Sequence, residues 1–367
     1  MQSERVKERV AIMENQQKRV WYLDYLRIMA TIAVVVLHVA AQNWYAVGVE
    51  TFEWRVFCVG NSLVRWAVPV FIMISGALFL NNSKPLSVEQ LYKKYIWRLV
   101  TAFLFWSALY LSGNLIKGDD VKTIVEAFIQ GPIHMWFMYM IVGLYMITPF
   151  LRKITESEQL TNYFLILFFV LTVGLPRMLE LLRIFEIPQA SWLQACYNEI
   201  SGKLAFHFTS GYVGYYVLGY YLSTKNMGQM LRKICYTLGG AGLAATVLLT
   251  FWYSDKTGVQ SVVFYAHFGF AMMCASVGIF TFAKYELAKH MPGERMMVWI
   301  SKMSKYSFGV YLSHILVLSG IRYVFGISTL SGNPIVSVIG LSIVVLAISY
   351  GISAVLHHIP VLRKYVV

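Results

Sequence analysis

The chain has 367 residues, of which 58% are hydrophobic and only 13% are charged. Because soluble globular proteins carry about 25% charged residues, this composition excludes an ordinary soluble fold and predicts a chain that is solvated by lipid. The net charge of +13 does not indicate nucleic-acid binding, since the basic residues lie at the ends of apolar runs, where they act as lipid anchors and topology signals.

The first predicted element is a polar segment, residues 1–20, which lacks the apolar core of a cleavable signal peptide and is expected to be a cytosolic juxtamembrane helix. A transmembrane domain, residues 21–357, and a cytosolic tail, residues 358–367, follow. Since a spanning helix needs roughly 20 mostly apolar residues, we expect an all-α polytopic membrane protein of about ten transmembrane helices. The fifth is interrupted by Pro176 and Arg177. The ten are expected near 21–42, 56–80, 99–116, 133–151, 163–182, 204–223, 233–253, 259–283, 305–326 and 334–357.

The distribution of basic residues predicts the orientation of these helices. Most of the 31 Lys and Arg residues fall in segments on one side of the ten-helix arrangement, which the positive-inside rule places in the cytosol together with both termini. We therefore expect Lys225 and Lys289 to be cytosolic and Lys117 and Lys256 to be outside. The polar stretch 183–203 is expected to be the longest outside loop.

The four cysteines do not predict a metal site. They are far apart, lack metal-ligand spacing and mostly fall within apolar runs, so they are interpreted as small apolar side chains (Cys58, Cys196, Cys235 and Cys274). We expect neither a metal ion nor a metal cofactor.

Ionisable residues within the apolar runs are informative, because a charge is costly in hydrocarbon and such residues often have a function. An intramembrane histidine can also simply hydrogen-bond a neighbouring helix, and the sequence leaves that alternative open for each residue. The residues of this kind are Arg27, His38, Arg65, His134, His207, His267 and His314.

The first expected helix carries the most specific pattern. Eleven positions separate Arg27 from His38, and at about 100° per residue the two side chains share one helix face. Their separation along the axis is about 16 Å, which would suit a long donor such as coenzyme A, with its phosphates at the cation and its thioester at the imidazole. Alternatively, Arg27 is a membrane anchor paired with Asp24, and His38 is a helix contact. Spacing alone does not decide between these interpretations.

Four motifs in order resemble the membrane-bound acyltransferase family 3, in particular its surface-polysaccharide O-acyltransferase branch. Arg27 and His38 match the family's pattern of Arg or Lys, ten residues and His. The segment 68–76, VPVFIMISG, resembles its second signature, and 134–150, beginning HMWFMYM, resembles a segment of the branch. The segment 306–314, YSFGVYLSH, resembles the family's tyrosine-rich stretch that ends in histidine.

This resemblance implies the roles of several residues. His38 and His314 would be catalytic, because neutral imidazole is well suited to take a hydroxyl proton near neutral pH. The donor would be acetyl-CoA, a substrate whose phosphates contact Arg27, Lys94 and Arg98. The acceptor would contact His134 and Trp136 at the outer end of the fourth expected helix, and Arg65 would hold a polar or anionic part of it. Asp24, Ser75 and Tyr311 would orient the site.

Two features depart from the family pattern. The family often has two arginines three residues apart before its third helix, whereas Tyr95 occupies the first of these places here and Arg98 the second. Lys94 is expected to supply the missing charge from the neighbouring position. His267 matches no signature of the family, and we therefore predict that it lies outside the active site.

The expected function is the transfer of an acetyl or similar short acyl group from cytosolic acyl-CoA to a hydroxyl of an envelope polysaccharide or lipid-linked sugar, in the inner membrane of a bacterium. The alternative is a membrane transporter or an amino-acid-binding membrane domain, and a third interpretation is a structural scaffold. A carrier would be expected to have paired broken helices at the membrane midplane, and the sequence predicts none.

Overall fold

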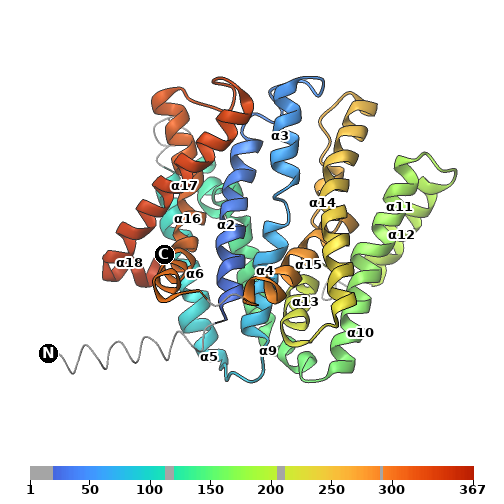
Figure 1. Ribbon diagram of the computed structural model, residues 1–367, viewed down its shortest axis with the longest axis horizontal. Helices are drawn as coiled ribbons and strands as arrows, with labels where there is room; N and C mark the ends of the chain where they lie inside the picture. The colour runs from blue at the N-terminus through green and yellow to red at the C-terminus, as the bar shows by residue number, and fades with distance from the viewer. Residues whose placement is uncertain (1–19, 112–119, 205–210, 290–291) are drawn as a thin grey trace.

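The computed structural model describes residues 20–111, 120–204, 211–289 and 292–367. Over these residues the chain forms helices joined by short connections and no β-strand (Figure 1). The longer helices of the first half are α2 (Trp21–Ala41), α3 (Phe52–Ser62), α4 (Ala67–Phe79), α6 (Trp97–Tyr110), α8 (Val121–Gln130), α9 (Trp136–Thr155), α10 (Glu158–Phe168) and α11 (Leu175–Ile184). Those of the second half are α12 (Ala190–Leu204), α13 (Tyr212–Thr224), α14 (Gln229–Thr257), α15 (Phe270–Tyr285), α16 (Glu294–Phe325) and α17 (Pro334–His358). Short helices are α5 (Val88–Gln90), α18 (Pro360–Tyr365), the π-helical η1 (Leu91–Ile96) and η3 (Phe169–Gly174), and the 3₁₀ turns η2 (Ile133–Met135), η4 (Val263–Tyr265) and η5 (Leu287–Lys289).

Eight helical runs among the described residues are long and apolar enough to cross a membrane. They cover 21–41, 52–79, 121–155, 158–184, 229–257, 263–289, 294–325 and 334–358. The expected class, an all-helical multi-pass membrane protein, is therefore confirmed. The other two expected spans correspond to α6 and α13, and each extends into a segment outside the described residues. Lys117 also lies outside the described residues. Ten spans and cytosolic termini remain predictions.

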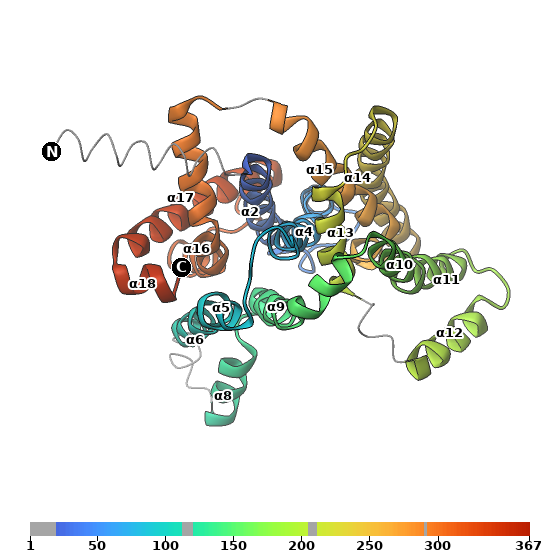
Figure 2. The same cartoon turned by 90° about the horizontal axis from the view of Figure 1, so that it is seen from below.

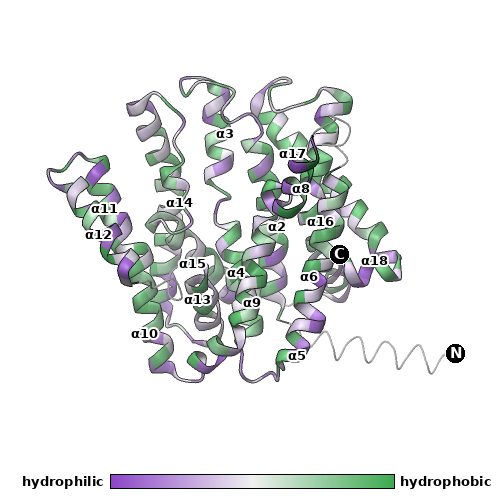
Figure 3. Ribbon diagram, turned by 180° about the vertical axis from the view of Figure 1, so that it is seen from behind, coloured by the Kyte–Doolittle hydropathy of each residue, from purple (hydrophilic) through white to green (hydrophobic). Residues whose placement is uncertain are grey.

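Apolar residues predominate along the helices (Figure 3), and many large apolar side chains are exposed. Leu248 on α14, Ile343 on α17 and Tyr163 on α10 are each about three-fifths exposed, 64%, 62% and 60% respectively. Water would not solvate such a surface, whereas lipid does. The composition that excluded a soluble fold is thus accounted for by these outer faces.

Helix α2 lies at the centre of the bundle and packs against α3, α4, α15, α16 and α17 (Figures 1 and 2). Leu26, Ala30 and Val39 on this helix are fully buried. A helix enclosed on several sides needs no polar face, which explains its nearly uniform apolar sequence between Arg27 and His38.

Helices α4 and α13 approach each other more closely than side chains would allow. A Cβ atom at Gly76 would lie 1.8 Å from the carbonyl oxygen of Tyr216, and one at Gly219 would lie 2.1 Å from that of Met73. Small residues that let backbones touch are a common means of helix association in membranes. This contact fixes α4, which carries part of the site described below.

The second expected span, 56–80, is two helices rather than one. Helix α3 ends at Ser62, α4 begins at Ala67, and a turn occupies the residues between them. Pro69 explains the break, because a proline ring clashes with the carbonyl group four residues earlier, here that of Arg65, and proline has no N–H to donate. The turn faces the interior of the bundle and becomes part of the site.

Two other segments differ from their expected form. The stretch 183–203 is largely helical, since α12 folds back beside α11 at the edge of the bundle instead of forming a loop (Figure 2). Pro176 does not interrupt the preceding run, because the π-helical η3 leads into α11 and the proline falls in the first turn of that helix. The last residues, expected as a tail, form α18 and pack on α6, and Val366 and Val367 are buried there.

Candidate active site

A cavity of about 520 Å³ lies inside the bundle, between α2, the turn before α4, the start of α9, the segment before α15, and α16. No Asp or Glu of the described chain lines it. Its polar and aromatic lining comprises Arg27, His38, Gln42, Arg65, Phe71, Ser75, His134, Trp136, Phe137, Tyr145, His267, Ser307, Phe308 and Tyr311. A second and larger space, a cleft of about 820 Å³, adjoins this inner cavity, and both are lined by Arg27, Leu99, Tyr145 and Phe308.

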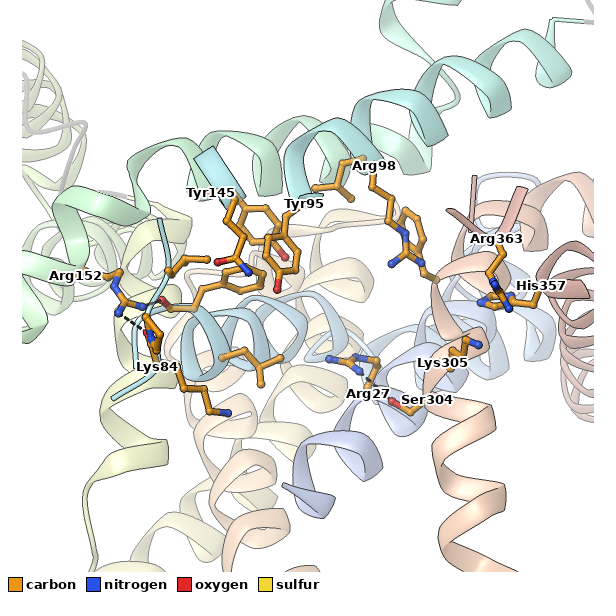
Figure 4. Close-up of a pocket in the computed structure, with 17 residues that line it drawn as sticks. Arg27, Lys84, Tyr95, Arg98, Tyr145, Arg152, Ser304, Lys305, His357 and Arg363 are labelled. Atoms are coloured by element: carbon orange, nitrogen blue, oxygen red, sulfur yellow. Dashed lines mark hydrogen bonds between the residues drawn. The ribbon is translucent and has the colours of Figure 1, made fainter. Parts of the chain in front are cut away.

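The cleft is strongly basic (Figure 4). Six Lys and Arg side chains from five helices and one loop line it, and within the described residues no carboxylate does (Arg27, Lys84, Arg98, Arg152, Lys305 and Arg363). His357 lies among them. Guanidinium and ammonium groups gathered in this way favour a polyanionic ligand, and arginine in particular suits phosphate.

Arg27 and His38 lie on the face of α2 that borders the inner cavity, as their spacing predicts. Arg27 forms an ion pair with Asp24 at 3.6 Å and donates a hydrogen bond to Ser304 Oγ at 3.0 Å. Ser304 in turn donates to Asp24 Oδ1 at 2.5 Å. Asp24 is only 5% exposed, so this α2 to α16 network holds the guanidinium at the junction of the two spaces.

His38 and His314 form a hydrogen-bonded pair. His38 Nδ1 lies 2.8 Å from the carbonyl oxygen of Val34 and 3.2 Å from His314 Nε2. His314 Nδ1 lies 2.7 Å from the carbonyl oxygen of Tyr311. Because a carbonyl oxygen only accepts, both Nδ1 atoms carry the proton, and His314 Nε2 accepts from His38. This assignment leaves the lone pair of His38 on Nε2, free to act as a base. His314 does not line the cavity, but its hydrogen bond joins it to His38, which does.

His134 lies beside this pair, in the turn η2 directly before α9. Its ring centroid is 5.1 Å from that of His314 and 6.2 Å from that of His38, and the residue is 3% exposed. The Tyr311 hydroxyl donates to the His134 carbonyl at 2.7 Å and so holds η2 against α16. Neither ring nitrogen of His134 bonds a described residue, and a buried orphan of this kind indicates a place for a ligand or water.

An aromatic wall closes another side of the cavity. The Trp136 ring stacks on that of His267, with centroids 6.1 Å apart and planes 25° apart, and Tyr212 lies 5.5 Å from Trp136. The Tyr212 hydroxyl and His267 Nδ1 are 2.8 Å apart. His267, predicted to lie outside the active site, therefore shares its cavity with His38. The signal that could have found it was an ionisable side chain within an apolar run.

Comparison with known families decides the class of protein. The sequence profile of acyltransferase family 3, described as an acyltransferase domain, matches residues 20–354. The chain belongs to this family. No curated protein and no solved structure matches it significantly. The expected class of enzyme, a membrane acyltransferase, is thereby confirmed.

The cations of this acyltransferase that were expected to bind the donor occupy different positions. The π-helical turn η1 precedes α6 and directs Tyr95 and Arg98 to the cleft, whereas Lys94 is exposed and lies outside the lining, 5.3 Å from the Tyr95 ring. Arg98 also hydrogen-bonds the backbone oxygen of Val367. Lys84, Arg152, Lys305 and Arg363 were not anticipated, because their charges were interpreted as topology signals.

The remaining predicted residues of the acyltransferase site are also placed. Ser75 lines the inner cavity and donates to the Phe71 carbonyl at 3.1 Å. Arg65, in the turn between α3 and α4, lines the same cavity, while His207 lies outside the described residues. No group of three or more His, Cys, Asp or Glu side chains in the described segments could hold a metal ion.

Proposed function

We propose that this acyltransferase transfers an acetyl or similar short acyl group from acyl-CoA to a hydroxyl of an envelope polysaccharide or lipid-linked sugar. One observation carries the proposal, namely that a basic cleft adjoins a cavity containing a histidine with a free Nε2 lone pair. The cleft would bind the donor from the cytosol, and the cavity would receive the acceptor from the other side of a bacterial inner membrane.

The donor is proposed to lie along α2. Arg27 and Arg98 contact its phosphates, with Lys94 as a more distant charge, and the pantetheine arm passes between Tyr145 and Phe308 into the inner cavity. Because α2 is unbroken from residue 21 to residue 41, His38 lies about 16 Å along the axis from Arg27. An extended pantetheine arm bridges a distance of this order and brings the thioester to the imidazole.

In the proposed reaction, His38 Nε2 takes the proton of the acceptor hydroxyl while the hydroxyl oxygen attacks the thioester carbonyl carbon. The carbon–sulfur bond then breaks, and the thiolate of coenzyme A leaves and receives the proton from His38. His314 accepts from the Nδ1–H of His38, so it stabilises the transient imidazolium. His134 and the aromatic face of Trp136 would position the sugar.

The nature of the acceptor rests on the sequence motifs. The segment 134–150 resembles a segment of the surface-polysaccharide branch of the family, which includes the O-acetyltransferase of the enterobacterial common antigen. We therefore assign the acceptor to the envelope glycans. Membership of an acyltransferase family favours this enzyme over the transporter or amino-acid-binding alternative.

The test is acyl transfer from radiolabelled acetyl-CoA by purified His38→Ala protein in membranes that contain the acceptor. We expect turnover to fall by about 10²–10⁴-fold, the usual contribution of a general base, with acetyl-CoA binding retained. His358→Ala is the matched control, because His358 is exposed and borders neither space. A His38→Ala protein that kept a tenth of wild-type turnover would lose only about 1.4 kcal/mol of transition-state stabilisation, too little for this role.

A further inference from the structure

Arg65 lies in the break between α3 and α4, within the span formed by residues 52–79. Its guanidinium is fixed on two sides. Nε donates to Asn61 Oδ1 at 2.7 Å, and the guanidinium carbon lies 4.6 Å from the centroid of the Tyr265 ring. No other hydrogen bond joins this guanidinium to a described residue, so its two terminal amino groups remain for a ligand in the cavity that Arg65 lines.

Arg65 differs from the neighbouring arginines in having no acidic partner. Arg27 pairs with Asp24, and Arg55, near the start of α3, pairs with Asp255 at 2.7 Å. No carboxylate of the described residues pairs with Arg65 or lines the cavity. An arginine inside a membrane domain is costly unless a counter-charge or water compensates it, and such residues commonly mark the path of a substrate.

Two other features of the cavity suit a ligand beside this cation. The buried ring nitrogens of His134 have no hydrogen-bond partner in the described chain, and the aromatic side chain of Trp136 lines the same cavity. These groups suit a polyhydroxylated ring, which hydrogen-bonds at its edges and stacks on an aromatic face. Arg65 adds a fixed positive charge to the same space.

We propose that Arg65 binds an oxyanion of the acyl acceptor, so that the acceptor is an acidic sugar or a phosphate-linked sugar and not a neutral glycan. The inference rests on the proposed function and narrows its acceptor class. A planar guanidinium with two free amino groups binds a carboxylate or phosphate through paired hydrogen bonds. On the proposed function the phosphates of the donor do not fill this role, because they lie at Arg27 and in the basic cleft, which Arg65 does not line.

The first experiment identifies the charge of the product. Membranes of a strain lacking the gene, supplied with the wild-type protein, are incubated with [¹⁴C]acetyl-CoA, and His38→Ala membranes give the background. The labelled glycan, freed of donor, is passed over an anion-exchange column at neutral pH. We expect it to be retained. The labelled glycan is then released from the lipid phosphate by mild acid and passed over the column again. If it is still retained, the anion belongs to the sugar, and if it is not, the anion was the phosphate. Labelled glycan in the flow-through overturns the proposal, and the absence of label overturns the proposed function as well.

The second experiment tests Arg65 itself, with the glycan fraction of the deletion strain as acceptor. We expect Arg65→Gln to raise the acceptor KM by on the order of 10–100-fold, with the KM for acetyl-CoA unchanged, because hydrogen bonds to charged groups are worth more than neutral ones. Arg65→Lys should recover part of the loss. Arg55→Gln is the matched control, since that arginine already has an acidic partner outside the cavity. A folded Arg65→Gln protein with the wild-type acceptor KM would refute the assignment.

Discussion

Replacement of His314 separates a base from the residue that positions it. His314 is buried, and leucine has a similar volume but no hydrogen-bonding atom. The His314→Leu substitution therefore removes the acceptor of the 3.2 Å hydrogen bond from His38 Nδ1. The Val34 carbonyl still accepts from Nδ1 at 2.8 Å, so the tautomer of His38 is retained and Nε2 can still act as a base. What is lost is one hydrogen bond to the imidazolium that forms during the reaction.

The expected magnitude follows from the charge of that imidazolium. A hydrogen bond to a charged group contributes about 1.5–3 kcal/mol, which corresponds to a fall in kcat of about 10–150-fold. The KM values should not change, because His314 does not line the cavity. His314→Gln, whose amide oxygen can accept from Nδ1, should recover part of the activity.

The assay is steady-state acetyl transfer at saturating acetyl-CoA, with folding monitored by size-exclusion chromatography in detergent. His358→Leu serves as the control for the substitution itself. A His314→Leu protein as inactive as His38→Ala would show that His314 takes part directly in the chemistry. Activity within twofold of wild type would show that the hydrogen bond is not used.

Three further predictions concern the donor, the packing and the orientation. Arg27→Ala should weaken acetyl-CoA binding, measured by calorimetry, by about tenfold or more, while Lys94→Ala, outside the cleft lining, should weaken it less. Equal losses of affinity in the two variants would contradict the geometry of the cleft. Gly76→Ala should lower the free energy of unfolding by about 1–3 kcal/mol, because the new Cβ would overlap a backbone oxygen of α13. Gly143→Ala, which has open space around it, should leave the stability nearly unchanged, and thermal unfolding of both variants measures the difference. A single cysteine at Lys289 should resist an impermeant thiol reagent added from outside and one at Lys256 should react, and the reverse result would invert the assigned topology.

Local periodicity was sufficient to predict α2 and the shared face of Arg27 and His38. The eleven-residue spacing determines that face once the helix is unbroken, and no long-range contact is needed. The break before α4 was missed, although Pro69 was visible, because hydropathy averaged over a span does not register a local interruption.

The features of the site that the sequence did not predict are those that depend on tertiary packing. The burial of His134 was not predicted, because it depends on the hydrogen bond from the Tyr311 hydroxyl that holds η2 against α16. His267 lines the cavity because it stacks on Trp136, which lies more than a hundred residues earlier in the chain. Likewise, nothing local tells which cations at helix ends turn inward to the cleft and which, such as Lys94, remain on the surface.

The continuity of α2 has a consequence for donor selection. A rigid helix fixes the separation of Arg27 and His38. On the proposed assignment, a donor must therefore have its phosphate and its acyl carbon the same distance apart. Acetyl phosphate, whose acyl group is joined directly to its phosphate, would be too short to reach both groups, however reactive it is. Coenzyme A separates the two by its pantetheine arm. The length of the helix between Arg27 and His38 would thus determine which donors are accepted. Lengthening or shortening this part of the helix by one turn, about 5.4 Å, would change the accepted donor length without altering a reacting residue.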